Sequence, residues 1–103
     1  MDFNNLDRAE LARHGLVFAT GAEAEAFGRL IRETLEIRVG EAIREEVGDL
    51  AAEEYDECPP ADEEAWLETN CPNFRDLARA VMEALERELM EYRDRIPGVI
   101  AAE

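Results

Sequence analysis

The chain is poor in the side chains that enzymes use for covalent and acid–base chemistry. Its 103 residues include no lysine, no serine and a single histidine, His14. Nucleophilic catalysis needs a nucleophile beside a general base, and a phosphate loop needs clustered glycines and usually a lysine. Neither pattern is present, so we expect that the protein is not an enzyme and binds no cofactor.

Metal-binding patterns are also missing. Cys58, Cys71 and the distant His14 lack the paired spacing of a zinc site, and the acidic run 56–64 lacks the alternation and central glycine of a calcium loop. A di-iron site would need histidines on long helices. We therefore expect no metal. The two cysteines either form a disulfide or remain free thiols, and the lack of an export signal favours free thiols.

Long apolar runs are absent as well. No stretch approaches the ~18 residues that a membrane span needs, and Met1–Asn5 holds no basic residue followed by an apolar run. We expect a cytoplasmic protein without membrane contacts.

Positive charge is scarce, since 26 acidic residues stand against 11 basic ones, all arginine, for a net charge of −15. Residues 49–73 hold nine acidic residues and no basic one. Such a field repels phosphate backbones. This charge pattern argues strongly against direct binding of DNA or RNA, unless a cation mediates it.

What the chain does contain is helical periodicity, which predicts an all-α fold. Apolar residues recur at three- and four-residue steps over about 21–47 and about 74–96, the pattern of two long amphipathic helices. The capping box at Thr20–Glu23 begins the first, and Asn73 is the expected cap of the second. Pro97-Gly98 is expected to end the second helix.

Two or three short helices are expected around the long ones. The first covers 4–13, with Asn4 as its cap and Gly15 as its left-handed stop. The second covers Asp49–Glu57, with Asp49 as its cap and Leu50, Ala51 and Tyr55 facing inward. The third runs from its cap Asp62 to Asn70 and is anchored by Trp66 and Leu67. Trp66, Phe74 and Tyr55 are expected in the core, as most aromatic side chains are.

Two glycines interrupt the first long helix, at a cost of roughly 1 kcal/mol each relative to alanine. We expect another backbone to approach closely at Gly28 and at Gly40, with a bend at Gly40 as the alternative. On the exposed side, residues four apart are expected to form ion pairs. These pairs are Glu25/Arg29, Arg29/Glu33 and Arg32/Glu36, with a second ladder along 79–95.

The length predicts one domain over 1–103, with an N-terminal extension 1–20, a core 21–96 and a tail 97–103. Two long helices cannot enclose a core alone. Either the short helices cap a helical hairpin, or a second copy of the chain completes a four-helix bundle as a dimer.

Two motifs resemble a known family. They are Arg38–Ile43, whose Arg-Val-Gly completes a Leu-Glu-x-Arg-Val-Gly pattern over residues 35–40, and Trp66–Phe74, which reads Trp-Leu-x-x-Asn-x-Pro-Asn-Phe. Together they resemble a family of small acidic helical bacterial domains of unknown function, over about residues 27–92. The Pro-Pro after Cys58 and the segment 1–20 depart from that pattern. The resemblance implies a helical fold and brings no activity, cofactor or catalytic residue.

The hypothesis that follows is a non-catalytic interaction module that presents the acidic region 49–68 to a basic partner, a second copy of itself, or both. The candidate partner-binding residues are Asp56, Glu57, Asp62, Glu63, Glu64 and Glu68. The alternative is an inhibitor that mimics the charge of nucleic acid, of the anti-restriction or anti-CRISPR type. A purely solubilising acidic surface is the simplest competing interpretation.

Overall fold

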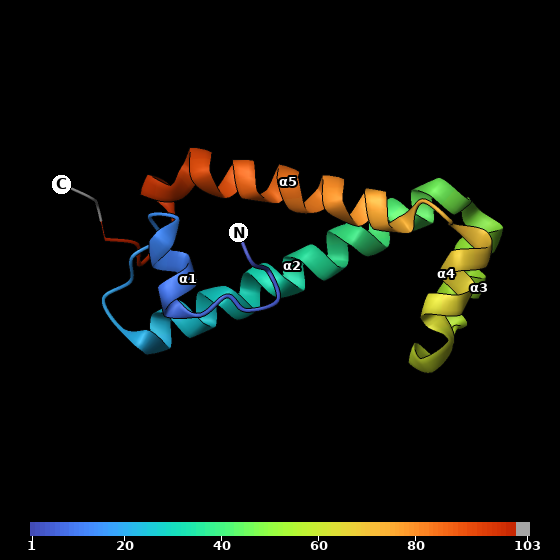
Figure 1. Ribbon diagram of the computed structural model, residues 1–103, viewed down its shortest axis with the longest axis horizontal. Coiled ribbons are helices and arrows are strands. Elements are labelled where there is room, and N and C mark those ends of the chain that lie inside the picture. Colours follow the sequence, from blue (N-terminus) through green and yellow to red (C-terminus); the bar gives the residue numbers. More distant parts are fainter. Residues whose placement is uncertain (101–103) are drawn as a thin grey trace. The chain divides into compact units, whose positions relative to one another are not determined.

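The computed structural model describes residues 1–100, and these fold as an all-α protein, as predicted (Figure 1). Within them the only extended pairing is an isolated bridge between Phe18 and Val99. The helices, including two short 3-10 helices η1 and η2, are α1 Arg8–Arg13, α2 Gly21–Val47, α3 Asp49–Glu57, η1 Pro60–Asp62, α4 Glu63–Asn70, α5 Phe74–Tyr92 and η2 Arg93–Arg95. Among the described helices, none is long and apolar enough to cross a membrane.

The chain divides into two compact units. The first unit holds residues 1–35 together with the chain from Met82 onward, and the second holds 36–81. Helices α2 and α5 are therefore each divided between the two units, α2 after Leu35 and α5 after Val81.

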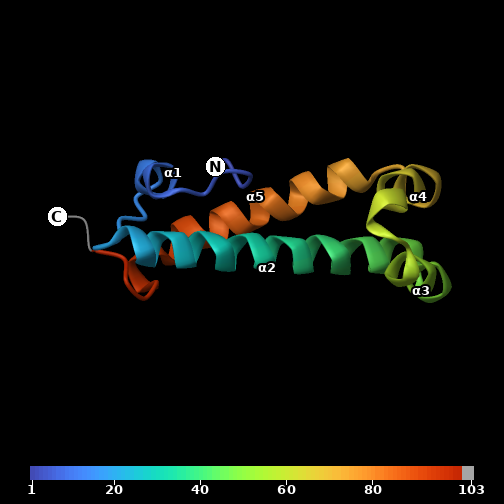
Figure 2. The same ribbon diagram turned by 90° about the horizontal axis from the view of Figure 1, so that it is seen from below.

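The first unit has an aliphatic and aromatic core. Its buried side chains are Phe3, Leu6, Leu11, Leu16, Phe18, Ala24, Ile31, Leu35, Leu85 and Leu89. The N-terminal segment passes beside α2 (Figure 2). The segment 1–20, which sequence analysis placed outside the core as an N-terminal extension, thus supplies five of the buried residues of this unit.

Helix α1 begins later than predicted. Asn4 is not its cap, because the backbone N–H of Asn4 donates to Asp2 Oδ1 in a turn. Asp7 is the cap instead: its backbone is extended and its carboxylate accepts from the N–H of Glu10 at 2.8 Å. The helix ends at His14 and Gly15, and Gly15 has the expected positive φ of 81°.

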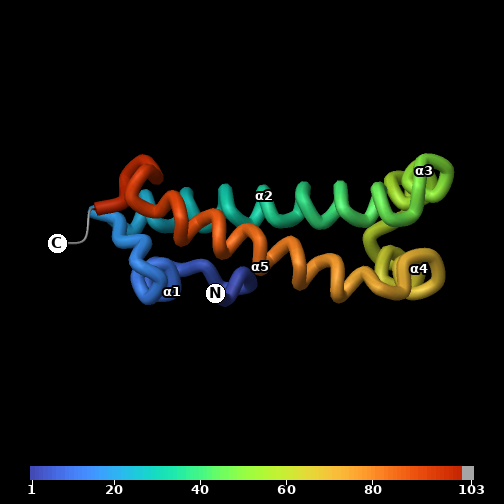
Figure 3. The backbone as a smooth tube through the Cα atoms, turned by 90° about the horizontal axis from the view of Figure 1, so that it is seen from above, coloured from blue at the N-terminus to red at the C-terminus, as the bar shows by residue number. Residues whose placement is uncertain are grey.

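The last described residues, up to Ile100, return to the link between α1 and α2 (Figure 3). The N–H of Ile100 donates to the carbonyl of Val17 at 2.7 Å. The last long helix ends at Tyr92 rather than near 96, and η2 follows it. Ile96 is extended, with ψ at 124°, as expected for a residue that precedes a proline.

The second unit is built on a small core of Ile43, Leu67 and Cys71. The side chains packed against it are Val39, Val47, Tyr55, Trp66, Phe74 and Leu77. The expectation that the three aromatic residues join the core is therefore confirmed, with each of them partly buried. Helices α3 and α4 lie side by side (Figure 1).

Two predictions about α3 are wrong. Leu50 does not face inward, since 87% of it is exposed. Asp49 is the first helical residue, and the cap position belongs to Gly48, whose φ of 85° makes the sharp break from α2. Asp62 does stand before α4, but its side chain makes no capping hydrogen bond.

The two glycines of α2 differ. A Cβ on Gly28 would lie 2.5 Å from the carbonyl oxygen of Leu6, so the predicted close approach of another backbone is confirmed there. A Cβ on Gly40 would meet only the side chain of Arg44, at 3.0 Å. The prediction of a second backbone at Gly40 is wrong within the described chain.

Candidate functional site

The acidic region is built on two helices that are bonded to each other. Trp66 of α4 donates from Nε1 to Glu54 of α3 at 2.9 Å. Tyr55 of α3 donates from its hydroxyl to Glu63 of α4 at 2.7 Å. The two rings lie 5.2 Å apart at a 48° tilt, a favourable aromatic geometry. Two carboxylates of the acidic region thus hold the helix pair together.

The environment of Tyr55 keeps its hydroxyl protonated. Burial, followed by the hydrogen bond to Glu63, raises the pKa of Tyr55 to about 12. A protonated phenol can continue to donate to Glu63 throughout the neutral range.

Of the six predicted partner-binding acids, four have partners within the second unit. Asp56 accepts from Arg44 at 2.9 and 2.6 Å. Arg75 of α5 lies between Glu64 and Glu68, at 3.2 and 3.4 Å. Glu63 accepts from Tyr55. Asp56, Glu63, Glu64 and Glu68 are therefore each bonded to another side chain of the same unit.

The carboxylates of the remaining two predicted acids, Glu57 and Asp62, make no hydrogen bond or ion pair within residues 1–100, although the backbone N–H of Asp62 donates to the carbonyl of Pro59 at 2.9 Å. The carboxylates of Asp49 and Glu53, which sequence analysis did not single out, also make none within this range. All four are exposed. These carboxylates are the part of the acidic region that is available to a partner.

Two arginines that reduce the charge of this surface were also missed. Arg44 and Asp56 are twelve residues apart, and Arg75 and Glu64 are eleven apart. Such pairs depend on how the helices of the second unit pack against one another. The four-residue spacing rule predicts only ion pairs within one helix, so it cannot find them. The sequence carries no signal that finds them.

The two cysteines are free thiols. Burial raises the pKa of both, assisted by Asp62 and Glu63 at Cys58 and by Glu46 at Cys71. The thiolate is the nucleophilic form, so this environment lowers the fraction of reactive thiolate at both side chains. Across the described part of the chain, no three His, Cys, Asp or Glu side chains are grouped to hold a metal ion.

The single histidine lies in the first unit between two carboxylates. His14 Nε2 is 2.9 Å from Glu10 of α1, and Nδ1 is 3.9 Å from Glu86 of α5. The hydrogen bond with His14 is the main reason that the pKa of Glu10 is lowered. The position at the end of α1 is the one predicted, and the contact links α1 to α5.

Residues 11–89 match the family described as protein of unknown function (DUF5663). The chain belongs to this family. The match includes α2, α3 and α4, and most of α5, so the DUF5663 region contains the whole acidic surface. No curated protein and no solved structure matches the chain.

Proposed function

We propose that this DUF5663 protein is a non-catalytic interaction module of the cytoplasm whose acidic surface, residues 49–68, binds a basic protein partner. The observation that carries the proposal is that the acidic residues of the second unit have two kinds of environment. Some of them bond α3 to α4, and others are left without an internal partner.

Charge supports this proposal. Residues 49–73 include nine acidic residues and no basic one. Arg44 and Arg75 reach in from α2 and α5 but pair with only three of the nine. The remaining field attracts a cationic surface and raises its rate of association at low salt.

Rigidity supports it as well. The Tyr55–Glu63 and Trp66–Glu54 hydrogen bonds join α3 to α4, and the rings pack on the unit core. A pre-organised surface loses less conformational entropy when it binds. Glu57 and Asp62 lie on either side of the Cys58–Ala61 link between the two helices, where nothing internal neutralises them.

The test is a quantitative binding comparison between three proteins. The tagged wild-type chain, the variant E57Q/D62N and the control variant E83Q/E91Q are used to recover partners, which are identified by mass. Both variants lose two charges, and the control changes exposed residues of α5 outside the acidic surface. The proposal expects basic partners that are lost with E57Q/D62N and kept with E83Q/E91Q. Equal recovery by all three would contradict it.

The kind of partner decides between the two functions considered for this surface. If the recovered protein binds nucleic acid, DNA or RNA is added as a competitor. Displacement of the protein from the chain by nucleic acid would indicate charge mimicry, whereas simultaneous binding would indicate an ordinary interaction module. A dimer of the chain, measured as its mass in solution, belongs to the same proposal because a second copy is one way to complete the helical bundle.

A further inference from the structure

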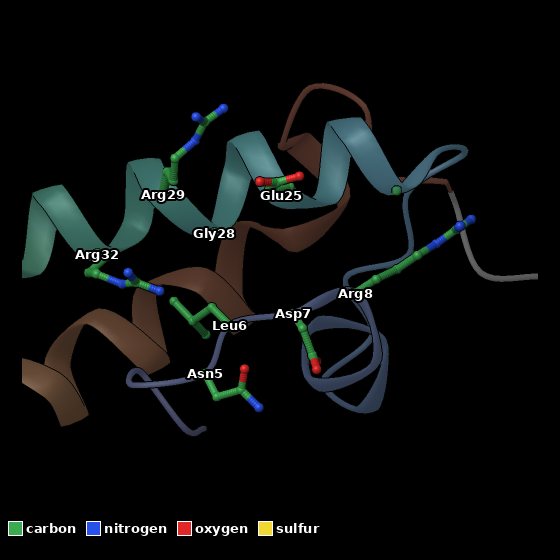
Figure 4. A pocket seen from close by; sticks show the side chains of 9 residues that line it. Asn5, Leu6, Asp7, Arg8, Glu25, Gly28, Arg29 and Arg32 are labelled. Atoms are coloured by element: carbon green, nitrogen blue, oxygen red, sulfur yellow. The ribbon is translucent and has the colours of Figure 1, made fainter.

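A groove in the first unit lies between α2 and the N-terminal segment Asn5–Arg8 (Figure 4). Its volume is about 520 Å³, within the range of small-molecule sites. The carbonyl of Leu6 lies so close to Gly28 that no side chain fits between them. The wall formed by the N-terminal segment is therefore held tightly against the helix.

Two charged residues of the groove already have internal partners. Asp7 caps α1 through the N–H of Glu10. Arg8 donates to the carbonyls of Phe18 and Ala19 at 3.2 and 3.3 Å. They shape the groove and are not free to bind a ligand.

Three other charged residues of the groove have no internal partner. The side chains of Glu25, Arg29 and Arg32 make no hydrogen bond or ion pair within the described residues. The expected pairs Glu25/Arg29, Arg29/Glu33 and Arg32/Glu36 are therefore not formed. Figure 4 shows Arg32 directed toward Leu6 and Arg29 directed away from the groove. The groove thus presents one available carboxylate and one available guanidinium.

Glu25 and Arg32 lie on one side of α2, because a separation of seven residues is close to two helical turns. Their Cα atoms are about 10 Å apart at the standard rise. Gly28 lies between them and carries no side chain, and the Leu6 carbonyl packs against it, so backbone alone forms the floor of the groove at this point. A ligand that contacts both groups needs opposite charges at its two ends.

We propose that this groove binds a small zwitterion, a free amino acid or a short peptide with free termini. The ligand carboxylate lies at Arg32 and its ammonium group at Glu25. A simple anion is opposed by Glu25 and by the net charge of −15, and a simple cation is opposed by Arg32 and Arg8. A zwitterion is attracted at both ends and carries no net charge for the field of the whole chain to repel.

The test is an NMR titration of the full chain with the dipeptide Ala-Ala. Two blocked analogues are titrated beside it: N-acetyl-Ala-Ala lacks the ammonium group, and Ala-Ala amide lacks the carboxylate. Because both protein groups are exposed, each blocked end is expected to weaken binding about three- to fivefold. Shifts are expected at the backbone amides of α2 around Gly28 and of Asn5–Arg8.

Two variants assign the ends. In R32Q the free dipeptide should lose its advantage over the amide. In E25Q it should lose most of its advantage over the N-acetyl analogue, which the net charge of the chain still opposes. R29Q, which changes the arginine directed away from the groove, should bind like the wild type. All three positions are exposed, and an unchanged amide spectrum away from the groove confirms the fold.

Several outcomes would overturn the proposal. These are no shift at the highest soluble dipeptide concentration, equal binding of free and blocked dipeptides by the wild type, or acetate alone binding as tightly as Ala-Ala. The last result would show an anion site. A loss of discrimination in R29Q equal to that in R32Q would also contradict the assignment.

Discussion

Tyr55 and Trp66 each donate a hydrogen bond to the helix that carries the other. Tyr55 of α3 reaches Glu63 of α4, and Trp66 of α4 reaches Glu54 of α3. An acidic surface built this way depends on some of its own carboxylates for its shape. Neutralising the whole region at once would therefore disturb the fold together with the charge.

The variant Y55F tests the contribution of this bonding to stability. It removes one hydroxyl and its bond to Glu63 while keeping the ring, so the free energy of unfolding should fall by about 1 kcal/mol. Urea unfolding followed by Trp66 fluorescence measures it. L50A is the control on the same helix, and it should stay within about 0.5 kcal/mol of wild type because Leu50 is exposed. Equal losses in the two variants would show that the hydrogen bond contributes nothing.

Stability should also fall at alkaline pH. The pKa of Tyr55 is raised to about 12 in the folded chain against an ordinary value of 10. Its contribution is complete below pH 10 and is lost as the pH rises through 12, because the unfolded chain releases the proton first. Unfolding midpoints measured between pH 9 and 12 should decline in the wild type and decline less in Y55F. Parallel curves would contradict this assignment.

Alanine substitution should have opposite effects at the two glycines of α2. In G28A the new Cβ meets the Leu6 carbonyl oxygen, so we expect a loss of about 1–3 kcal/mol. In G40A the guanidinium of Arg44, which pairs with Asp56, must shift slightly, and alanine favours the helix by up to about 1 kcal/mol. Thermal unfolding of both variants checks the contrast. A stabilised G28A would show that the N-terminal segment does not lie on α2.

Acid should weaken the contact of α1 with α5. The pKa of Glu10 is lowered, first by its hydrogen bond with His14. Its contribution to stability is therefore present above the ordinary value of 4.5 and is lost as the pH falls through the lowered folded value. Glu86 and the Met1 ammonium group face the same site and are present in both proteins compared. Acid unfolding of H14Q should begin at a higher pH than that of the wild type, whereas coincident curves would contradict the contact.

Local sequence rules predicted the parts of this fold that depend on local physics. Periodicity predicted the all-α class and the span 21–47, and the left-handed stop at Gly15 was predicted because glycine has no Cβ to oppose a positive φ. The close approach at Gly28 was predicted because a mid-helix glycine needs a compensating contact. Residues 11–89 match a family of unknown function, which is the kind of family that the resemblance implied.

What local rules missed depends on how helices cross. Leu50 fits an inward helical position, yet α3 is rotated so that Tyr55 packs on the core and Leu50 is exposed. Arg75 pairs with Glu64 and Glu68 of another helix, rather than along its own. Which acids remain free for a partner follows from these crossings, so six candidates could be named from the sequence but not separated into bonded and available ones.

The central claim is that the available carboxylates bind a basic partner. Its most direct test is the dissociation constant of the recovered partner, measured against salt for the wild type, E57Q/D62N and E83Q/E91Q. The account predicts weaker binding and a shallower salt dependence for E57Q/D62N alone. The same affinity and the same salt dependence in all three proteins would contradict it.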